Sequence, residues 1–240
     1  MKKVLPVLLL AALVGGVAWR LVKRPSFRYA GTVEATEVDI SPRLTSTIAE
    51  IPAVEGQDVK AGDLLVRLSG EDFKIAAAQA DSDFARAKRL VASGSMTTEA
   101  YDRVRFHQQD AALHVQWLTI TSPINGVVLD RFHEPGEQVS PPVKLLKLAD
   151  MNDVWATIYV PQTTLAKLKL GMALEATLPE LDGKKIEGKV KHIRDEAEFT
   201  PRNVQTREER ARLVYAVKVA LPNGDRLLKP GMTVEVKLPE

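Results

Sequence analysis

The 240-residue chain contains no cysteine. This absence excludes disulfides, thiolate metal sites, a cysteine nucleophile and lipidation through an N-terminal cysteine. Aromatic residues are scarce as well, at 5% of the chain, so we expect no large core clusters around Trp or Phe. The formal net charge is only +2, which provides no general attraction to nucleic acid, and no basic motif with interleaved aromatics is present.

Sequence motifs for catalysis are missing too. No serine lies in a nucleophile-elbow context, and no glycine-rich phosphate loop is found. His107 and His114 lie seven residues apart on one expected helix. No third ligand completes a metal site there, because Asp110 lies on a neighbouring line of side chains along that helix and not in line with the two histidines. We therefore predict a protein that is not an enzyme and that uses no cofactor and no metal.

One apolar run lies at the N-terminus. Two lysines precede an uncharged stretch of sixteen residues, 4–19, and three basic residues beginning with Arg20 follow it. Such a helix spans roughly 24 Å, a little less than a bilayer core of about 30 Å, and snorkelling of Arg20 would extend it. A cleaved signal peptide is the alternative, but bulky Trp19 and the basic cluster disfavour cleavage. We predict a single-pass anchor over residues 1–24.

A degenerate internal repeat organises the next part of the chain. Residues 40–68 and 120–148 each contain a proline turn, a short alternating strand, a glycine turn and a second short strand. Each copy is too short to bury its own apolar face, so the two halves are expected to close into one β-sandwich over residues 40–69 plus 120–149. At an offset of 80, Gly56, Val59, Leu65 and Leu68 correspond to Gly136, Val139, Leu145 and Leu148.

Between the two copies the apolar residues recur in steps of three and four, which predicts two helices with a heptad seam. Ser93, Gly94 and Ser95 break the pattern, and Thr97 or Thr98 can cap the second helix. We predict an antiparallel coiled-coil hairpin over residues 70–119. Its facing pairs are Phe73–Leu118, Ala77–Val115, Ala80–Ala111, Phe84–Gln108, Ala87–Val104 and Val91–Tyr101. The polar Gln108 would set the register of the seam.

Beyond Leu148 the pattern returns to short strands, expected at 154–160, 171–178, 185–193, 213–221 and 232–238, with a short helix at 161–168. Asp182-Gly183 and Asn223-Gly224 are turn dipeptides. Many short strands with one small helix favour a closed barrel over residues 150–240. Residues 25–39 would form a linker or a first strand.

This order of segments resembles the HlyD-type membrane fusion proteins, also called periplasmic adaptors, over residues 31–240. The stretch 199–235 (FTPRNVQTREERARLVYAVKVALPNGDRLLKPGMTVE) is similar to the barrel of members that serve ABC-type exporters. The resemblance implies a mainly β fold with a helical hairpin: a lipoyl-like β-sandwich split by an antiparallel coiled coil, then a small β-barrel. With the N-terminal membrane anchor, it places the chain in a bacterial inner membrane with its bulk in the periplasm.

The resemblance also implies partners. These are an inner-membrane transporter, with the ABC type favoured over the proton-driven RND type, an outer-membrane TolC-type channel, and further copies of the chain in a ring, six by family expectation. Members that dock TolC carry Arg, Leu and Ser at a fixed spacing near the hairpin tip. Arg86, Leu90 and Thr97 have that spacing here, with Thr replacing Ser. An exposed helix charge and a plain N-cap are the alternative account, and the hairpin is shorter than in drug-efflux adaptors.

Two other classes of protein share parts of this pattern. Repeated half-motifs also occur in lipoyl or biotinyl carriers of acyl- or carboxyl-transfer enzymes, which display a lysine on a tight turn between the halves. Here the expected hairpin occupies that turn, and the nearest lysine, Lys74, already lies on its first helix. A structural scaffold of the cell envelope would have the same fold as an adaptor and would differ only in what it binds.

Overall fold

The computed structural model describes residues 27–199 and 213–239. The expected anchor over residues 1–24 lies outside the described residues, as do residues 200–212 of the stretch that resembles ABC-associated adaptors. Within the described residues, no helix combines the length and the apolar character needed to cross a bilayer. These residues form two compact units. One contains residues 34–154 and 223–230, and the other contains residues 27–33, 155–199, 213–222 and 231–239.

The first unit contains a β-sandwich. One of its sheets has the strand order β5-β4-β2-β7. In the other, β3 pairs with β6 and β6 pairs with β8. Short strands form here because each brief segment turns one or a few apolar side chains inward and is followed by a stretch with glycine or proline. The strands are β2 (Ser46–Glu50), β3 (Asp58–Val59), β4 (Leu64–Leu68), β5 (Thr119–Thr121), β6 (Gly126–Arg131), β7 (Gln138–Val139) and the first part of β8 (Leu146–Pro161).

The internal repeat appears in the sandwich as reciprocal hydrogen bonds. The N–H of Gly56 donates to the carbonyl of Val128, and the N–H of Gly136 donates to the carbonyl of Ile48, both at 2.8 Å. The two donors, like the two acceptors, are 80 residues apart, which is the offset found in the sequence. Gly56 and Gly136 have φ values of +80° and +94°, a conformation that favours glycine. Each half of the repeat therefore completes the other.

The core of the sandwich is aliphatic. The six apolar residues that the offset of 80 matches are at most 5% exposed, and they belong to one cluster that draws on both sheets. Burying a leucine or valine side chain stabilises the fold by about 2 kcal/mol. The alternating pattern therefore fixes which face of each short strand is buried. The six residues are Val59, Leu65, Leu68, Val139, Leu145 and Leu148.

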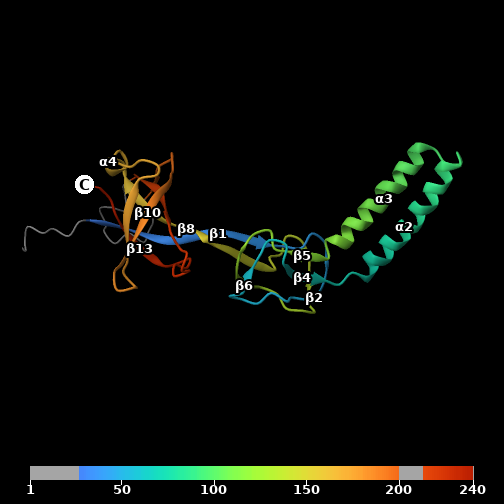
Figure 1. Ribbon diagram of the computed structural model, residues 1–240, viewed down its shortest axis with the longest axis horizontal. Helices are drawn as coiled ribbons and strands as arrows, with labels where there is room; N and C mark the ends of the chain where they lie inside the picture. Colours follow the sequence, from blue (N-terminus) through green and yellow to red (C-terminus); the bar gives the residue numbers. More distant parts are fainter. Residues whose placement is uncertain (1–26, 200–212, 240) are drawn as a thin grey trace, which may run out of the picture. The chain divides into compact units, whose positions relative to one another are not determined.

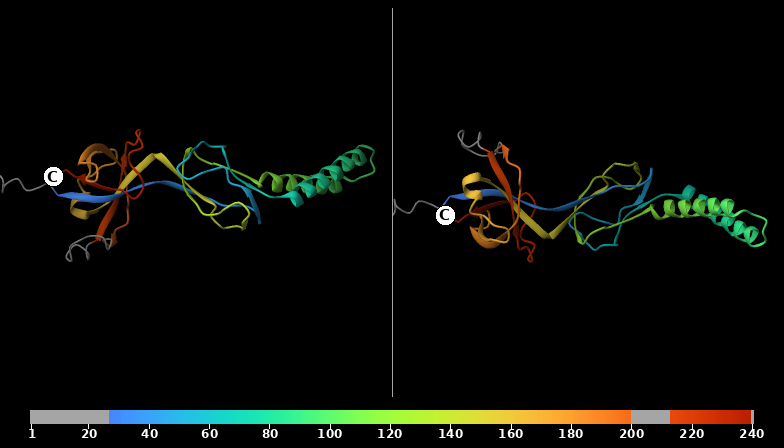
Figure 2. Two further views of the ribbon diagram at one scale, coloured as in Figure 1. Left: turned by 90° about the horizontal axis from the view of Figure 1, so that it is seen from below. Right: turned by 90° about the horizontal axis from the view of Figure 1, so that it is seen from above.

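The helical hairpin interrupts the sandwich between β4 and β5. It consists of α2 (Glu71–Ala92) and α3 (Thr98–Gln116), which run antiparallel and lie side by side in all views (Figures 1 and 2). Helix α2 ends where Ser93 caps it, with Gly94 at a φ of +71°. Helix α3 begins at Thr97, whose hydroxyl accepts a hydrogen bond from the N–H of Ala100 at 3.3 Å. Of the two expected caps, Thr97 is confirmed.

The second unit is a small closed barrel. Six of its described strands follow one another in the order β12-β10-β9-β13-β1-β8, and a pairing of β12 with β8 closes the ring. The predicted fold class, mainly β with a helical hairpin, a sandwich and a barrel, is thus confirmed. The elements of this unit are the start of β1 (Arg28–Ile40), the end of β8, α4 (Gln162–Leu165), β9 (Ala173–Leu178), β10 (Lys184–Ile193), β11 (Glu198–Phe199), β12 (Leu213–Leu221) and β13 (Thr233–Lys237).

Several elements differ from their expected extent. Strand β8 begins before the expected start at 154, at Leu146, because the last strand of the repeat continues without a turn. The helix expected over 161–168 is only four residues long, with Pro161 as its N-cap. Residues 25–39, expected as a linker or first strand, contain most of the long strand β1. Residues 150–154 and 223–230 were expected with the barrel, and they group with the sandwich unit instead.

Candidate functional site: the hairpin and its tip

Helices α2 and α3 pack through small side chains. Ala80, Ala87 and Ala111 are at most 6% exposed, so the two backbones approach closely there. Every residue of the expected seam is buried or half-buried, whereas the large apolar residues Ile75, Phe106 and Leu113 between seam positions are exposed. The half-buried seam residues are Phe73, Ala77, Phe84, Val91, Tyr101, Val104, Gln108 and Val115, and Leu118 is buried.

Side-chain contacts along the hairpin add detail to the expected pairing. The rings of Phe84 and Tyr101 lie 5.7 Å apart, although Gln108 was the expected neighbour of Phe84. The amide Nε2 of Gln108 instead donates to Oδ1 of Asp81 at 2.8 Å. Gln108 thus finds a charged partner beside the seam, which satisfies its polar end while its stem stays half-buried.

The tip residues are accessible to a partner. The side chain of Arg86 is 65% exposed and forms an ion pair with Asp83, with 3.6 Å between Nη2 and Oδ1. Leu90 is 40% exposed, which is high for a leucine on a helix that packs against another. Thr97 is exposed too, but its hydroxyl is engaged in the cap of α3. The tip therefore presents one exposed cation and one exposed apolar side chain, together with a hydroxyl that already caps α3.

The base of the hairpin contains an aromatic cluster that sequence reasoning missed. The ring of His114 lies 5.8 Å from that of Phe73 and 5.2 Å from that of Trp117, and the guanidinium of Arg43 lies over Trp117 at 5.8 Å. Phe73 and Trp117 also pack against the core of the sandwich. Cation–π and aromatic contacts of this kind contribute about 1 kcal/mol each. A signal was present in the sequence, since these aromatics gather at the two ends of the hairpin segment.

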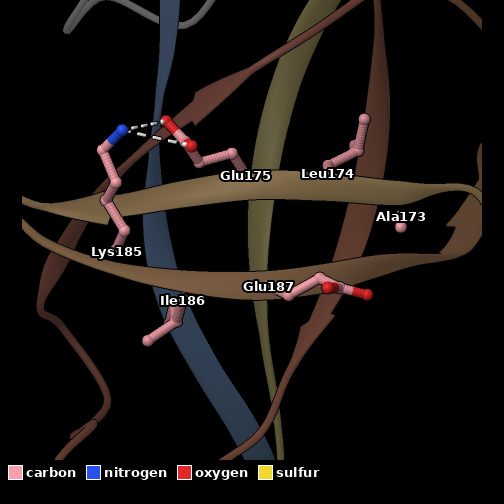
Figure 3. Close-up of a pocket in the computed structure, with 6 residues that line it drawn as sticks. All are labelled: Ala173, Leu174, Glu175, Lys185, Ile186 and Glu187. Carbon is pink, nitrogen blue, oxygen red and sulfur yellow. Dashed lines mark hydrogen bonds and ion pairs between the residues drawn. The ribbon is translucent and has the colours of Figure 1, made fainter.

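No metal centre is formed by the described residues, which contain no group of three His, Asp or Glu side chains suited to a cation. His114 is part of the aromatic cluster, and His107 is exposed. On the barrel, a shallow hollow lies over the β9–β10 hairpin (Figure 3). Lys185 closes one side of it through an ion pair with Glu175, 3.1 Å from Nζ to Oε1. That carboxylate is already neutralised, so we assign no chemistry to the hollow.

A sandwich split by a helical hairpin, together with a six-stranded barrel, defines an adaptor-type protein. Two family models match the chain: a CzcB-like barrel-sandwich hybrid domain over residues 36–150 and a CusB-like beta-barrel domain over residues 153–240. The two matches cover nearly all of the described residues. The chain belongs to the membrane fusion protein, or periplasmic adaptor, family.

Curated relatives are named as membrane proteins. A UPF0194 membrane protein from Acidithiobacillus ferridurans is 42% identical over 118 residues, which are 49% of this chain and 35% of the relative. The UPF0194 membrane protein YbhG from Salmonella gallinarum is 33% identical over 125 residues, 52% of this chain and 38% of the relative. The chain thus spans little more than a third of the length of these relatives.

Solved structures share the fold at low identity. A chimeric MacA-MexA protein with the Pseudomonas aeruginosa MexA α-hairpin domain has a TM-score of 0.73 at 21% identity, covering 90% of this chain and 82% of that one. The membrane fusion protein Spr0693 from Streptococcus pneumoniae R6 has a TM-score of 0.62 at 21% identity, covering 90% and 99%. ZneB from Cupriavidus metallidurans has a TM-score of 0.57 at 21% identity, covering 88% and 97%.

Proposed function

We propose that this chain is a periplasmic adaptor that links an inner-membrane exporter to an outer-membrane TolC-type channel. The observation that carries the proposal is the insertion of a solvent-exposed helical hairpin between the two halves of the sandwich, at residues 70–119. This insertion displays a long, rigid helical surface far from the chain termini in sequence. A protein of this kind breaks no bond. It works by holding two other proteins at a fixed spacing.

The hairpin tip would supply the contact with the channel. An exposed guanidinium forms strong bidentate hydrogen bonds to carboxylates and carbonyls of a partner. Arg86 is available for this role because its ion pair with Asp83 is solvated and therefore weak. Leu90 lies one helical turn nearer the tip and would bury its exposed surface in a groove between partner helices. Thr97 would contribute chiefly by fixing the start of α3.

The transporter would be an ABC-type exporter, because residues 199–235 resemble the barrel of adaptors that serve such exporters. An RND-type transporter is the second candidate, since the family model that matches residues 153–240 describes a CusB-like beta-barrel of the RND group. In either case the chain would be held in the inner membrane by the stretch 4–19, with its bulk in the periplasm. Several copies would assemble into a ring, with six as the expected number. Together these features make the HlyD type our proposed subtype.

The carrier alternative is disfavoured by the position of its lysine. Lys74 lies within the first turn of α2, not on a tight turn, and its ammonium is 2.6 Å from Oε1 of Glu71. A carrier lysine must swing between active sites, which an ion-paired position in a helix opposes. The scaffold alternative shares every structural feature with the adaptor, and only the partners distinguish the two.

The decisive experiment identifies those partners. The tagged full-length chain would be crosslinked mildly in native membranes and purified, and the proteins that accompany it would be identified by mass spectrometry. Recovery of an ABC-type or RND-type transporter, with or without an outer-membrane channel, supports the adaptor and decides the pump class. Recovery of no transporter points to the scaffold. An acyl-transfer enzyme together with a modified lysine points to the carrier.

A further inference from the structure

The outer face of α3 is more apolar than a solvated helix face requires. Phe106 is 61% exposed and Leu113 is 43% exposed. Each lies midway between two seam residues, so both side chains point away from α2. The two residues are seven positions apart, which places them on one line along the helix. Exposed large apolar residues in a row on one face, unlike single scattered ones, indicate a binding surface.

The outer face of α2 carries smaller side chains. Ser82 lies midway between the seam residues Ala80 and Phe84, so its side chain points away from α3, and it is exposed. Ala78 and Ala85 flank Ser82 on the same side of the helix and are exposed as well. At one end of this row Ile75 is 70% exposed. The row is thus a shallow track of small side chains that ends in one large apolar residue.

The two outer faces match in height along the hairpin. The bond between Gln108 and Asp81 fixes the antiparallel register, so Phe106 and Leu113 lie level with the stretch 75–85 of α2. Large side chains on one face therefore stand at the level of small ones on the other. Because the faces point in opposite directions, they cannot meet within one hairpin. They would meet if a second copy stood beside the first at the same height.

Charge also favours this arrangement. Toward the tip, the outer face of α2 carries Arg89, which is exposed, beside Arg86, which the proposed function assigns to the channel. The corresponding face of α3 carries mainly acidic residues. Glu99 and Asp102 form exposed ion pairs of 3.2 and 3.1 Å within their own helix, and such pairs exchange partners at little cost. One face is thus mainly positive and the other mainly negative. The charged residues of the α3 face are Glu99, Asp102, Arg103 and Asp110.

We propose that Phe106 and Leu113 pack on the small-residue track of α2, residues 75–85, in a neighbouring copy of this chain. The contact is head-to-tail, because the α3 face of one copy meets the α2 face of the next. Each copy can therefore bind one neighbour on either side, and successive copies close into a ring. The proposal deepens the assembly part of the proposed function and rests on it. It assigns the apolar part of the ring contact to Phe106, Leu113 and the stretch 75–85, which lie away from the tip.

Cysteine crosslinking tests the contact directly, because the 240-residue chain has no native cysteine to interfere. Ser82→Cys and Gln109→Cys place thiols on the two outer faces, the latter between Phe106 and Leu113. In whole cells, a short bismaleimide should convert the double variant into a ladder of dimers, trimers and larger species. Either single variant should remain monomeric. Dimers from a single variant would show like faces meeting and would overturn the proposal, as would absence of a ladder.

A second set of variants tests the apolar residues themselves. In the double-cysteine chain, Phe106→Gln with Leu113→Gln should reduce the ladder at least tenfold, with helix content by circular dichroism unchanged. Leu90→Gln, an equivalent change at the tip, should leave the ladder intact. A ladder that survives loss of both apolar residues would overturn the proposal.

The crosslinks and the partner search separate this contact from the proposed function. If the ladder is absent but the transporter is still recovered by mass spectrometry, this contact is wrong and the adaptor function stands. A ladder without any transporter contradicts the adaptor function alone and supports the contact.

Discussion

Asn223 and Leu228 are joined by two hydrogen bonds that use both ends of the asparagine amide. Oδ1 of Asn223 accepts from the N–H of Leu228 at 2.8 Å, and Nδ2 donates to the carbonyl of Leu228 at 3.0 Å. Nδ2 also donates to the carbonyl of Met151 at 2.9 Å. Asn223 is 3% exposed and Leu228 is 2% exposed. A single buried side chain therefore ties the 223–230 loop to strand β8.

Replacing Asn223 with Ala should lower the free energy of unfolding by about 3 kcal/mol, because three buried backbone groups lose their partner and each costs about 1–3 kcal/mol before relaxation or entry of water. Thermal unfolding of the full-length chain in detergent, followed by circular dichroism, measures the effect. Asn152→Ala is the matched control, since Asn152 is exposed and should change stability by less than about 0.5 kcal/mol. Equal unfolding temperatures for the two variants would contradict this role for Asn223.

Gly70 should not tolerate a methyl group. A Cβ at this position would lie 2.3, 2.5 and 2.9 Å from side-chain carbons of Leu118, which is 4% exposed. Gly70→Ala should therefore destabilise the chain by about 1–3 kcal/mol, measured by the same thermal unfolding. Gly224→Ala is the control, because nothing lies within 4 Å of its missing Cβ.

A double-mutant cycle separates this clash from a simple loss of backbone freedom. Leu118→Ala should be destabilising by itself, since it empties a core position, but it should also remove the cost of Gly70→Ala. The double variant should then be more stable than the sum of the single changes predicts. Strict additivity would show that the two residues do not collide.

The sequence was sufficient for features that depend on period and repetition. The offset of 80 predicted the sandwich, since Leu65 and Leu145 occupy equivalent buried sites, and steps of three and four predicted the hairpin. Both patterns are local in origin: alternation reflects a half-buried strand and heptads reflect a helix that is apolar on one side.

Features that depend on single long-range contacts could not be predicted. Asn223 was interpreted as part of a turn dipeptide, yet its side chain bonds to Met151, 72 residues away. Arg226, not Asn223 or Gly224, adopts a positive φ of 53° and forms an ion pair with Asp58. No periodic pattern in the sequence indicates such contacts, because they arise only once distant segments are folded together.

Phe84 and Phe106 offer a matched test of the seam, because the same substitution falls on opposite faces of the hairpin. Phe84→Asp should unfold much of the hairpin, since a carboxylate would replace a half-buried ring that packs on Tyr101. Phe106→Asp should leave the helices intact, because that ring is 61% exposed. Circular dichroism and limited proteolysis within residues 71–116 report the outcome. If the Phe84 variant stayed fully helical, the seam assignment would be wrong.

The turn before β7 should respond to acid through Glu137. A hydrogen bond from His133, followed by bonding to the backbone near Glu134, lowers the pKa of Glu137 from its ordinary value of 4.5. A carboxyl group whose pKa is lowered on folding stabilises the fold above its unfolded pKa, and that contribution disappears as the pH falls through the folded pKa. His133→Ala should therefore raise the pKa of Glu137 toward its ordinary value and reduce the acid dependence of stability below about pH 5.

The carboxyl resonance of Glu137 in an NMR titration measures this pKa directly. Glu134→Gln is a suitable control, because Glu134 pairs with Arg131 at 2.6 Å and its backbone contact to Glu137 is retained. The pKa of Glu137 should stay low in that variant. An unchanged pKa in the His133 variant would show that the imidazole is not its cause.

Reversing the charge at the hairpin tip should separate channel docking from folding. Arg86→Asp removes an exposed ion pair with Asp83, so stability should change by less than about 1 kcal/mol. If Arg86 docks the channel as proposed, recovery of an outer-membrane channel by crosslinking should nevertheless fall at least tenfold, since a repelling carboxylate would replace the guanidinium. Recovery of the inner-membrane transporter should be unchanged, because we expect the barrel to contact the transporter and Arg86 lies on the hairpin. Lys74→Asp, the same reversal at the other end of α2, should leave both partners in place. Equal channel recovery in the two variants would show that the tip does not dock through Arg86, and that Arg86 is only an exposed charge on the helix.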